Sequence, residues 1–193
     1  MIAAADIEGL FHNQLSSIGN ATTRDLVVAT WVEAARLGGW RTVDDLKAMP
    51  FTLLTRTHGI SLVDHTIAVT EGAVALVRAQ MNAYPNMPYA VNMDRLIAGG
   101  LLHDVGKLVE TEPDGKGGFR KSRKGMYARH PISGAIIAAR CGMPDDVVNT
   151  IACHAKEGDG APKVLETVLI HQADFATFDP LVMLEKGQLI IDE

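Results

Sequence analysis

The sequence predicts an all-α fold in a single domain spanning residues 1–193. Apolar residues recur at helical spacing along most of the chain, and the strict alternation typical of β-strands is nearly absent. A chain of 193 residues with 47% hydrophobic residues can close one substantial core. The one exception that the pattern allows is a small β-hairpin in the 111–129 loop.

Residues 1–59 are expected to form an N-terminal helical extension. A helix should begin near Thr22 and end at the glycine pair 38–39. Its inner face would consist of Val27, Val28, Trp31 and Ala35. A second, short helix should follow Thr42, whose hydroxyl can cap it while Asp45 supplies the acidic half of a capping box.

Residues 60–180 are expected to form the core of the fold. Helices are predicted from Ile60 to Met81, from about Asp94 to about Val109 with Asp94 as its cap, from Pro131 to about Gly142, and from about Pro144 to His154. A last helix around Asp174 has apolar neighbours on nearly every side, which predicts that it is buried nearly all round.

Ionisable residues occupy apolar stretches where water-soluble helices rarely place them. The run from Leu101 to Lys107 is too apolar for a solvated helix, so an unpaired charge within it would be costly. Any one such residue is usually a hydrogen-bonded core residue. Together they supply what two divalent ions need, namely about six imidazole and carboxylate ligands with one bridging carboxylate. The predicted metal ligands are His65, His103, Asp104, His130, His154 and Asp174.

Basic residues surround the predicted ligands in the sequence. The glycine-rich segment 116–125 carries five positive residues between two ligand segments, although an ordinary solvated turn would look the same. Lys107 follows Asp104 by three residues on an expected continuous helix, so its ammonium could bind a substrate oxygen; the alternative is a surface lysine near a helix end. The residues expected to contact substrate are Lys107, Arg120, Lys121, Lys124 and Arg129.

Composition narrows the expected partners and compartment. A net charge of −5 argues against long nucleic acid. The local basic segment could still bind a small anion, and it suits a small phosphorylated substrate. Two cysteines without a disulfide or zinc spacing fit a reducing cytoplasm. Neither a secretion signal nor a membrane span is indicated. The apolar residues 181–184 and 190–191 hint at a homodimer, and the oligomeric state stays open.

The order of the six predicted ligands resembles the HD superfamily of metal-dependent phosphohydrolases, over roughly residues 60–180. The resemblance implies that Asp104 bridges two divalent ions, iron or manganese, with His65, His103 and Asp174 around one ion and His130 and His154 around the other. It also implies that Asp104 and Lys107 are catalytic, and that a hydroxide held by both ions hydrolyses a phosphoester in a small molecule or nucleotide.

Two further resemblances leave alternatives open. The segment 103–107 is similar to the opening motif of the HD-GYP cyclic-dinucleotide phosphodiesterases, but Ala155 replaces an expected histidine and Gly160-Ala161-Pro162 replaces Gly-Tyr-Pro. Cleavage of cyclic di-GMP is therefore not implied. The same ligand set is similar to that of HD-fold mixed-valent di-iron oxygenases, which activate oxygen instead of water. A non-catalytic sensing module stabilised by metal is the remaining alternative.

Overall fold

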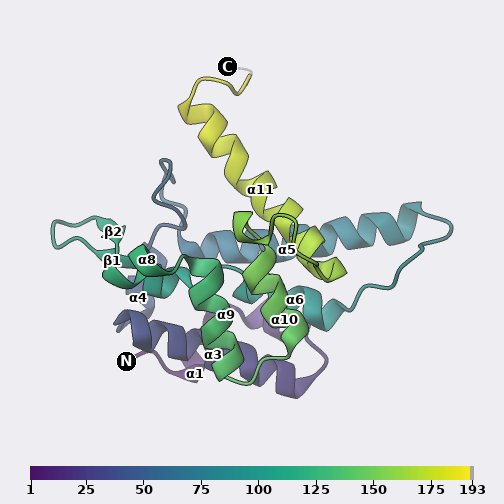
Figure 1. Cartoon of the computed structure of the whole chain (residues 1–193), viewed down its shortest axis with the longest axis horizontal. Helices are drawn as coiled ribbons and strands as arrows, with labels where there is room; N and C mark the ends of the chain where they lie inside the picture. The colour runs from purple at the N-terminus through teal and green to yellow at the C-terminus, as the bar shows by residue number, and fades with distance from the viewer. Residues whose placement is uncertain (192–193) are drawn as a thin grey trace.

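The computed structural model describes residues 1–191 and confirms the all-α prediction. Helices pack around a common hydrophobic core, and the described part of the chain contains only one two-stranded sheet (Figure 1). That sheet is the hairpin predicted in the 111–129 loop, with β1 (Thr111–Pro113) antiparallel to β2 (Phe119–Lys121).

The N-terminal helices support the rest of the bundle from below in Figure 1. They are α1 (Ala4–Leu10), α2 (His12–Ser16), α3 (Ala21–Gly38) and α4 (Val43–Ala48). The predicted capping box is present, because Thr42 accepts from the backbone of Asp45 and the Asp45 carboxylate accepts from the backbone of Thr42. The start of α3 is capped by the side chain of Asn20.

Two tryptophans fix the segment that carries the His-Asp pair. The indole of Trp31 donates to the carbonyl of Leu101 at 2.8 Å, and the indole of Trp40 donates to the carbonyl of Leu108 at 2.7 Å. Both rings are almost completely buried, so these bonds are shielded from water. They hold the backbone on both sides of residues 103–104.

The central layer consists of α5 (Leu62–Ala83), α6 (Met93–Leu102) and α11 (Leu165–Glu185). Two adjacent glycines let α6 approach its neighbours closely. A Cβ on Gly100 would lie 2.7 Å from the hydroxyl of Thr70 on α5, and one on Gly99 would lie 2.9 Å from side chains of Thr150 and Ile170. The glycine pair therefore brings three helices together just before His103.

The remaining helices complete the bundle. They are α7 (Lys107–Glu110), α8 (Arg123–Tyr127), α9 (His130–Arg140), α10 (Asp145–Cys153) and the 3₁₀ turn η1 (Lys156–Gly158). Helix α7 lies next to the hairpin, and α9 packs against α10. Pro131 lies in the first turn of α9, as predicted. A Cβ on Gly106 would lie 2.1 Å from the carbonyl oxygen of His130, so α9 begins in direct backbone contact with the turn before α7.

Three local predictions were wrong. The expected helix over 94–109 is broken, because residues 103–106 form a turn between α6 and α7. Asn92 caps α6, whereas Asp94 accepts from the backbone of Gly19 and Asn20 and so ties α6 to the chain before α3.

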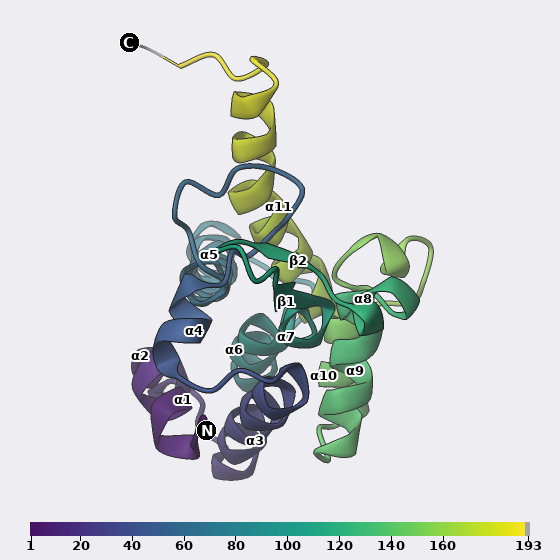
Figure 2. The same cartoon turned by 90° about the vertical axis from the view of Figure 1, so that its left-hand side faces the viewer.

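The helix that carries Asp174 is not buried nearly all round. Its buried residues all belong to its first half, and its second half projects from the bundle (Figure 2). Phe178 and Leu181 in the second half are only partly buried where they pack against the core. None of the helices in residues 1–191 has the length and hydropathy of a membrane span.

Candidate metal centre

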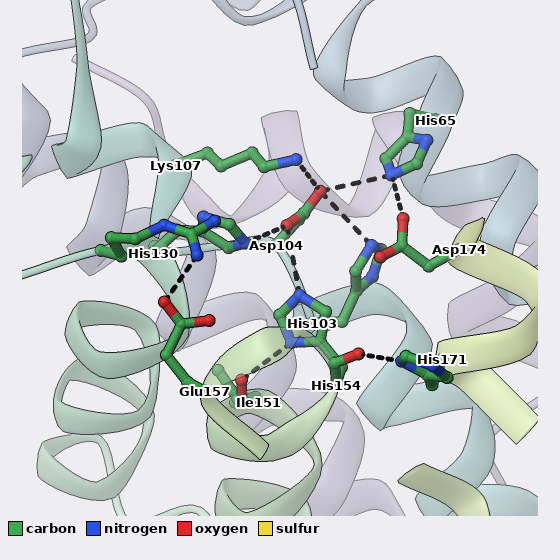
Figure 3. A network of polar contacts seen from close by, with 12 residues as sticks. His65, His103, Asp104, Lys107, His130, Ile151, His154, Glu157, His171 and Asp174 are labelled. Carbon is green, nitrogen blue, oxygen red and sulfur yellow. Dashed lines mark hydrogen bonds and ion pairs between the residues drawn. The ribbon is translucent and has the colours of Figure 1, made fainter. Parts of the chain in front are cut away.

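The six predicted ligands converge on one buried point (Figure 3). His65 comes from α5, His103 and Asp104 from the turn after α6, His130 from the first residue of α9, His154 from the end of α10, and Asp174 from α11. Five of these side chains are buried, and the side chain of Asp174 is 14% exposed. Segments more than a hundred residues apart therefore contribute to one cluster.

Asp104 is the centre of the cluster. Its Oδ2 lies 3.3 Å from Nε2 of His65 and 3.4 Å from Nε2 of His103. Its Oδ1 lies 3.2 Å from Nε2 of His130 and 3.5 Å from Nε2 of His154. Each carboxylate oxygen thus faces a different pair of imidazoles, which is the arrangement required of a bridging carboxylate.

The four imidazoles are oriented by hydrogen bonds on their other nitrogen. Nδ1 of His103 lies 2.6 Å from the carbonyl of Gly100, and Nδ1 of His154 lies 2.8 Å from the carbonyl of Ile151. Nδ1 of His130 lies 2.7 Å from the carboxylate of Glu110. Because carbonyls and carboxylates only accept, these Nδ1 atoms carry the proton, and Nε2 is left with its lone pair.

His65 follows the same rule through a hydroxyl. The hydroxyl of Thr177 donates to the carbonyl of Asp174, so its oxygen is free to accept from Nδ1 of His65 at 3.3 Å. All four rings therefore direct Nε2 toward Asp104. Histidine ligands of metals are commonly fixed by such a partner on the second nitrogen.

The atoms that face the centre lack hydrogen-bond partners. Within the described part of the chain, Nε2 of His65, His103 and His154 and both carboxylate oxygens of Asp104 are buried without one, although Oδ2 of Asp104 forms an ion pair with Lys107. Unsatisfied buried polar atoms are expensive, and here they point at each other. A divalent cation would satisfy them, so the residues fit the metals that the sequence predicts.

The cluster divides into two groups that share Asp104. One group contains His65, His103, Asp104 and Asp174, and the other contains Asp104, His130 and His154. Within each group the nearest ligand atoms all lie within 4.8 Å of one another. This division is the one that the family resemblance implies for two ions.

The pKa shifts show two carboxylates that stay ionised inside the cluster, which favours the binding of a cation there. Burial raises the pKa of Asp104, yet Lys107 and the neighbouring histidines hold it well below its usual range. Burial likewise raises the pKa of Asp174, but the imidazole of His65, 3.1 Å away, brings it to about 2. Burial lowers the pKa of His65, and the nearby carboxylates of Asp104 and Asp174 outweigh this and raise it. Burial lowers the pKa of His130 to about 4, so its ring is neutral near pH 7.

Lys107 reaches the cluster although the helix is not continuous. Its Nζ lies 2.5 Å from Oδ2 of Asp104 and 5.6 Å from the centre of the Phe51 ring. The turn over 103–106 places the first residue of α7 over the carboxylate, as a continuous helix was expected to do.

A cavity of about 500 Å³ opens over the cluster. Lys107, His130 and Asp174 belong to its lining, together with the predicted substrate residues Lys121 and Arg129. Lys121 also lies 3.4 Å from Glu110, and Arg129 donates to Glu157 at 2.7 Å. A small molecule bound in this cavity over the cluster would therefore contact Lys107, Lys121 and Arg129.

Arg120 and Lys124 do not line this cavity. Arg120 pairs with Glu112 across the hairpin at 2.9 Å, because alternate residues of β2 point to opposite sides. Lys124 donates to the carbonyl of Leu37 at 3.0 Å and lines a separate cavity. The structure thus separates them from the cluster, although they are close to Lys121 in sequence.

Several residues of the site had no clear signal in the sequence. Glu110 accepts from both the backbone N–H and Nδ1 of His130 at 2.7 Å, and those hydrogen bonds, opposing the effect of burial, lower its pKa to about 2. Lys156 lines the cavity from η1. An apolar part of the lining comes from Phe51, Leu53, Leu54, Phe175 and Phe178.

Comparison with known proteins assigns the family. The HD domain family matches residues 62–176, which include all six converging side chains. The chain belongs to the HD domain family. Membership supports a metal-dependent phosphohydrolase as the general class, and it supports the binding of divalent metal by the cluster.

The curated relatives of this HD domain protein include ribonucleases Y. The chain is 30% identical over 118 residues to ribonuclease Y of Thermotoga petrophila, and 32% identical over 118 residues to that of Pseudothermotoga lettingae. Each match covers 61% of this chain and 18% of the relative, so the chain spans less than a fifth of the length of these proteins. No solved structure matches.

Proposed function

We propose that this HD domain protein hydrolyses a phosphoester in a small molecule or nucleotide at two divalent metal ions. The observation that carries the proposal is the set of unsatisfied atoms around Asp104, whose two oxygens face different pairs of imidazoles. A single ion would leave one of these pairs without a partner.

The proposed ligands follow the two groups of side chains. His65, His103 and Asp174 would hold one ion, His130 and His154 would hold the other, and Asp104 would bridge them. Imidazole and carboxylate suit iron and manganese, which we propose as the native metals. When bound, two such ions activate water and offset the charge on the phosphoryl oxygens.

The protein's own contribution is to bind and orient the phosphate. Lys107 has its ammonium at the floor of the cavity, next to Asp104, where it can bind a phosphoryl oxygen. Lys121 and Arg129 line the cavity around it and can contact the remaining oxygens, Arg129 in a bidentate manner. Arg120 and Lys124 have no part in the proposal, because neither lines this cavity.

The basic lining favours a phosphate over an uncharged substrate. Besides Lys107, the cavity is lined by three cationic side chains, Lys121, Arg129 and Lys156, and only Glu110 and Asp174 oppose them on the lining. Both carboxylates lie beside histidines of the cluster, and three of the cations are themselves paired with carboxylates. With two divalent ions bound at the cluster, an anion entering this cavity would meet a net positive field.

Turnover of a phosphoester panel tests the proposal. The full chain is loaded anaerobically with Mn²⁺ or Fe²⁺ and assayed with mononucleotides and small phosphomonoesters, with and without oxygen. We expect phosphate release that does not depend on oxygen and that is lost in Asp104→Ala. Turnover that requires oxygen would reject hydrolysis in favour of an oxygenase, and the absence of any turnover by the metal-loaded chain would reject the proposed activity.

A further inference from the structure

The cavity over the cluster has an apolar part as well as a basic part. Its basic residues come from α7, from the hairpin, from the segment before α9 and from η1, whereas its apolar residues come from the loop between α4 and α5 and from α11. The two sets therefore belong to different elements. A ligand that fills the cavity would contact both.

The apolar part begins at the cluster itself. The ring of Phe51 stacks on the imidazole of His65, with 4.3 Å between centroids and 19° between planes. Phe178 meets Phe51 edge-on at 6.4 Å. Leu53 and Leu54 line the same cavity and, unlike Phe51, are exposed. The apolar lining thus includes a ring stacked on a proposed metal ligand as well as side chains that reach solvent.

Two residues of this apolar lining are exposed. Leu54 is 79% exposed and Leu53 is 46% exposed, although both are large apolar side chains. Isolated exposed leucines are ordinary on protein surfaces, but these two are adjacent and line a concave site. Contact with an apolar ligand would remove part of their surface from water, which is favourable.

The loop that carries the two leucines is held in place. Its base is closed by a bridge between Pro50 and Ser61 and by a 2.8 Å hydrogen bond from Leu62 to the carbonyl of Met49. Its far side is tied to α11, because the carboxylate of Glu185 accepts from the hydroxyl of Thr55 and from the backbone of Arg56 (Figure 2). The apolar wall is therefore preorganised for binding.

Resting on the proposed function, we propose that the substrate is a phosphomonoester of an aromatic or otherwise apolar alcohol. Its phosphate binds at the cluster beside Lys107, and its apolar group lies along Phe178, Leu53 and Leu54. A volume of about 500 Å³ suits a ligand of that size. Polar phosphates such as glycerol 3-phosphate use only the basic half of the cavity.

Two pairs of probes test this inference on the metal-loaded full chain. For turnover, kcat/KM is measured with 1-naphthyl phosphate and with glycerol 3-phosphate. For binding without turnover, Kd is measured by calorimetry with 1-naphthylphosphonate and with methylphosphonate. We expect the naphthyl compound of each pair to be preferred at least tenfold, which is what a few apolar contacts supply.

The variant Leu53→Ser/Leu54→Ser isolates the apolar wall. Because both side chains are exposed, the substitutions leave the core intact. We expect the naphthyl preference to fall about tenfold in both assays. Leu76→Ser is the matched control, because Leu76 is 40% exposed on α5 and does not line the cavity; its preference should equal that of the wild type.

The outcomes separate this inference from the proposed function. Phosphate release without a naphthyl preference, or a preference that the double variant keeps, would overturn the substrate class and leave hydrolysis standing. A naphthyl preference in phosphonate binding that the double variant loses, without any turnover, would support the ligand class and overturn hydrolysis. Equal binding of both phosphonates by the wild type would overturn the inference on its own.

Discussion

Glu110 should control how tightly the cluster holds metal, although it is not a proposed ligand. Its Oε2 accepts from both the backbone N–H and Nδ1 of His130 at 2.7 Å, and His130 supplies Nε2 to the group around Oδ1 of Asp104. Glu110→Gln keeps the shape and one acceptor oxygen but removes the negative charge. A neutral amide oxygen accepts more weakly than a carboxylate, so the variant favours a proton on Nδ1 of His130 less strongly than the wild type does.

The size of the effect follows from these two bonds. A hydrogen bond to a charged group contributes about 1.5–3 kcal/mol, against about 0.5–1.5 kcal/mol for a neutral pair, so the variant should lose about 2 kcal/mol of unfolding free energy. Substituting a hydrogen-bonded partner of a histidine ligand typically weakens metal binding about 10–100-fold. We expect that loss for the ion held by His130 and His154.

Chelator competition measures the two metal affinities, and denaturant unfolding of the metal-free protein measures the stability. Glu112→Gln is the matched control, because Glu112 pairs only with Arg120 on the exposed hairpin, where an ion pair contributes about 0–1 kcal/mol. Unchanged affinity for both ions in Glu110→Gln would refute the orientation of His130 by this carboxylate.

Three other substitutions probe separate parts of the account. Gly106→Ala should lower the free energy of unfolding in denaturant by at least about 2 kcal/mol, because the added Cβ would meet the carbonyl of His130. Gly9→Ala is the control, because a Cβ there meets open space and should not destabilise the protein. Equal stabilities of the two variants would contradict the close contact at Gly106. Lys107→Ala should keep its metal content but lose about 100-fold in kcat/KM with a phosphomonoester, and wild-type kinetics would remove Lys107 from the site. Backbone N–H groups of Arg41 and Thr42 lower the pKa of Asp45 in the folded state, so its contribution to stability is present above its ordinary pKa and is lost as the pH falls below it. Asp45→Asn should therefore flatten the fall of unfolding free energy between pH 5 and pH 3, and an unaltered slope would exclude this role.

The convergence of the six cluster residues could be anticipated because each is an ionisable residue in an apolar stretch, where such residues are uncommon. Histidines and carboxylates on apolar helical faces are rare without partners, and His103-Asp104 and Asp174 stand out for that reason in a single sequence. The helical pattern around them predicted the bundle. Their roles as ligands of particular ions remain predictions.

The rest of the site depends on contacts that the sequence does not encode locally. Glu110 looks like an ordinary helix-end carboxylate, and only the contact of α7 with α9 brings it to His130. Arg120 and Lys121 are adjacent in sequence, yet the strand directs them to opposite sides. No pattern in the sequence singles out Leu53 and Leu54, and only the tertiary fold places them on the lining of this cavity.

The break between α6 and α7 has a similar cause. Apolar periodicity favours an unbroken helix there, although Gly106 is a residue type that often ends helices. Burial of both carboxylate oxygens of Asp104, with Gly106 against the backbone of His130, requires the chain to turn. Tertiary contacts thus outweigh local preference at the centre of the site.

Metal quantification on the full chain tests the central claim most directly. Protein loaded anaerobically with Mn²⁺ or Fe²⁺ and freed of excess metal should contain two ions per chain, and Asp104→Ala should contain fewer than one. A wild-type content of one ion or none, or two ions retained by Asp104→Ala, would contradict a centre bridged by this carboxylate.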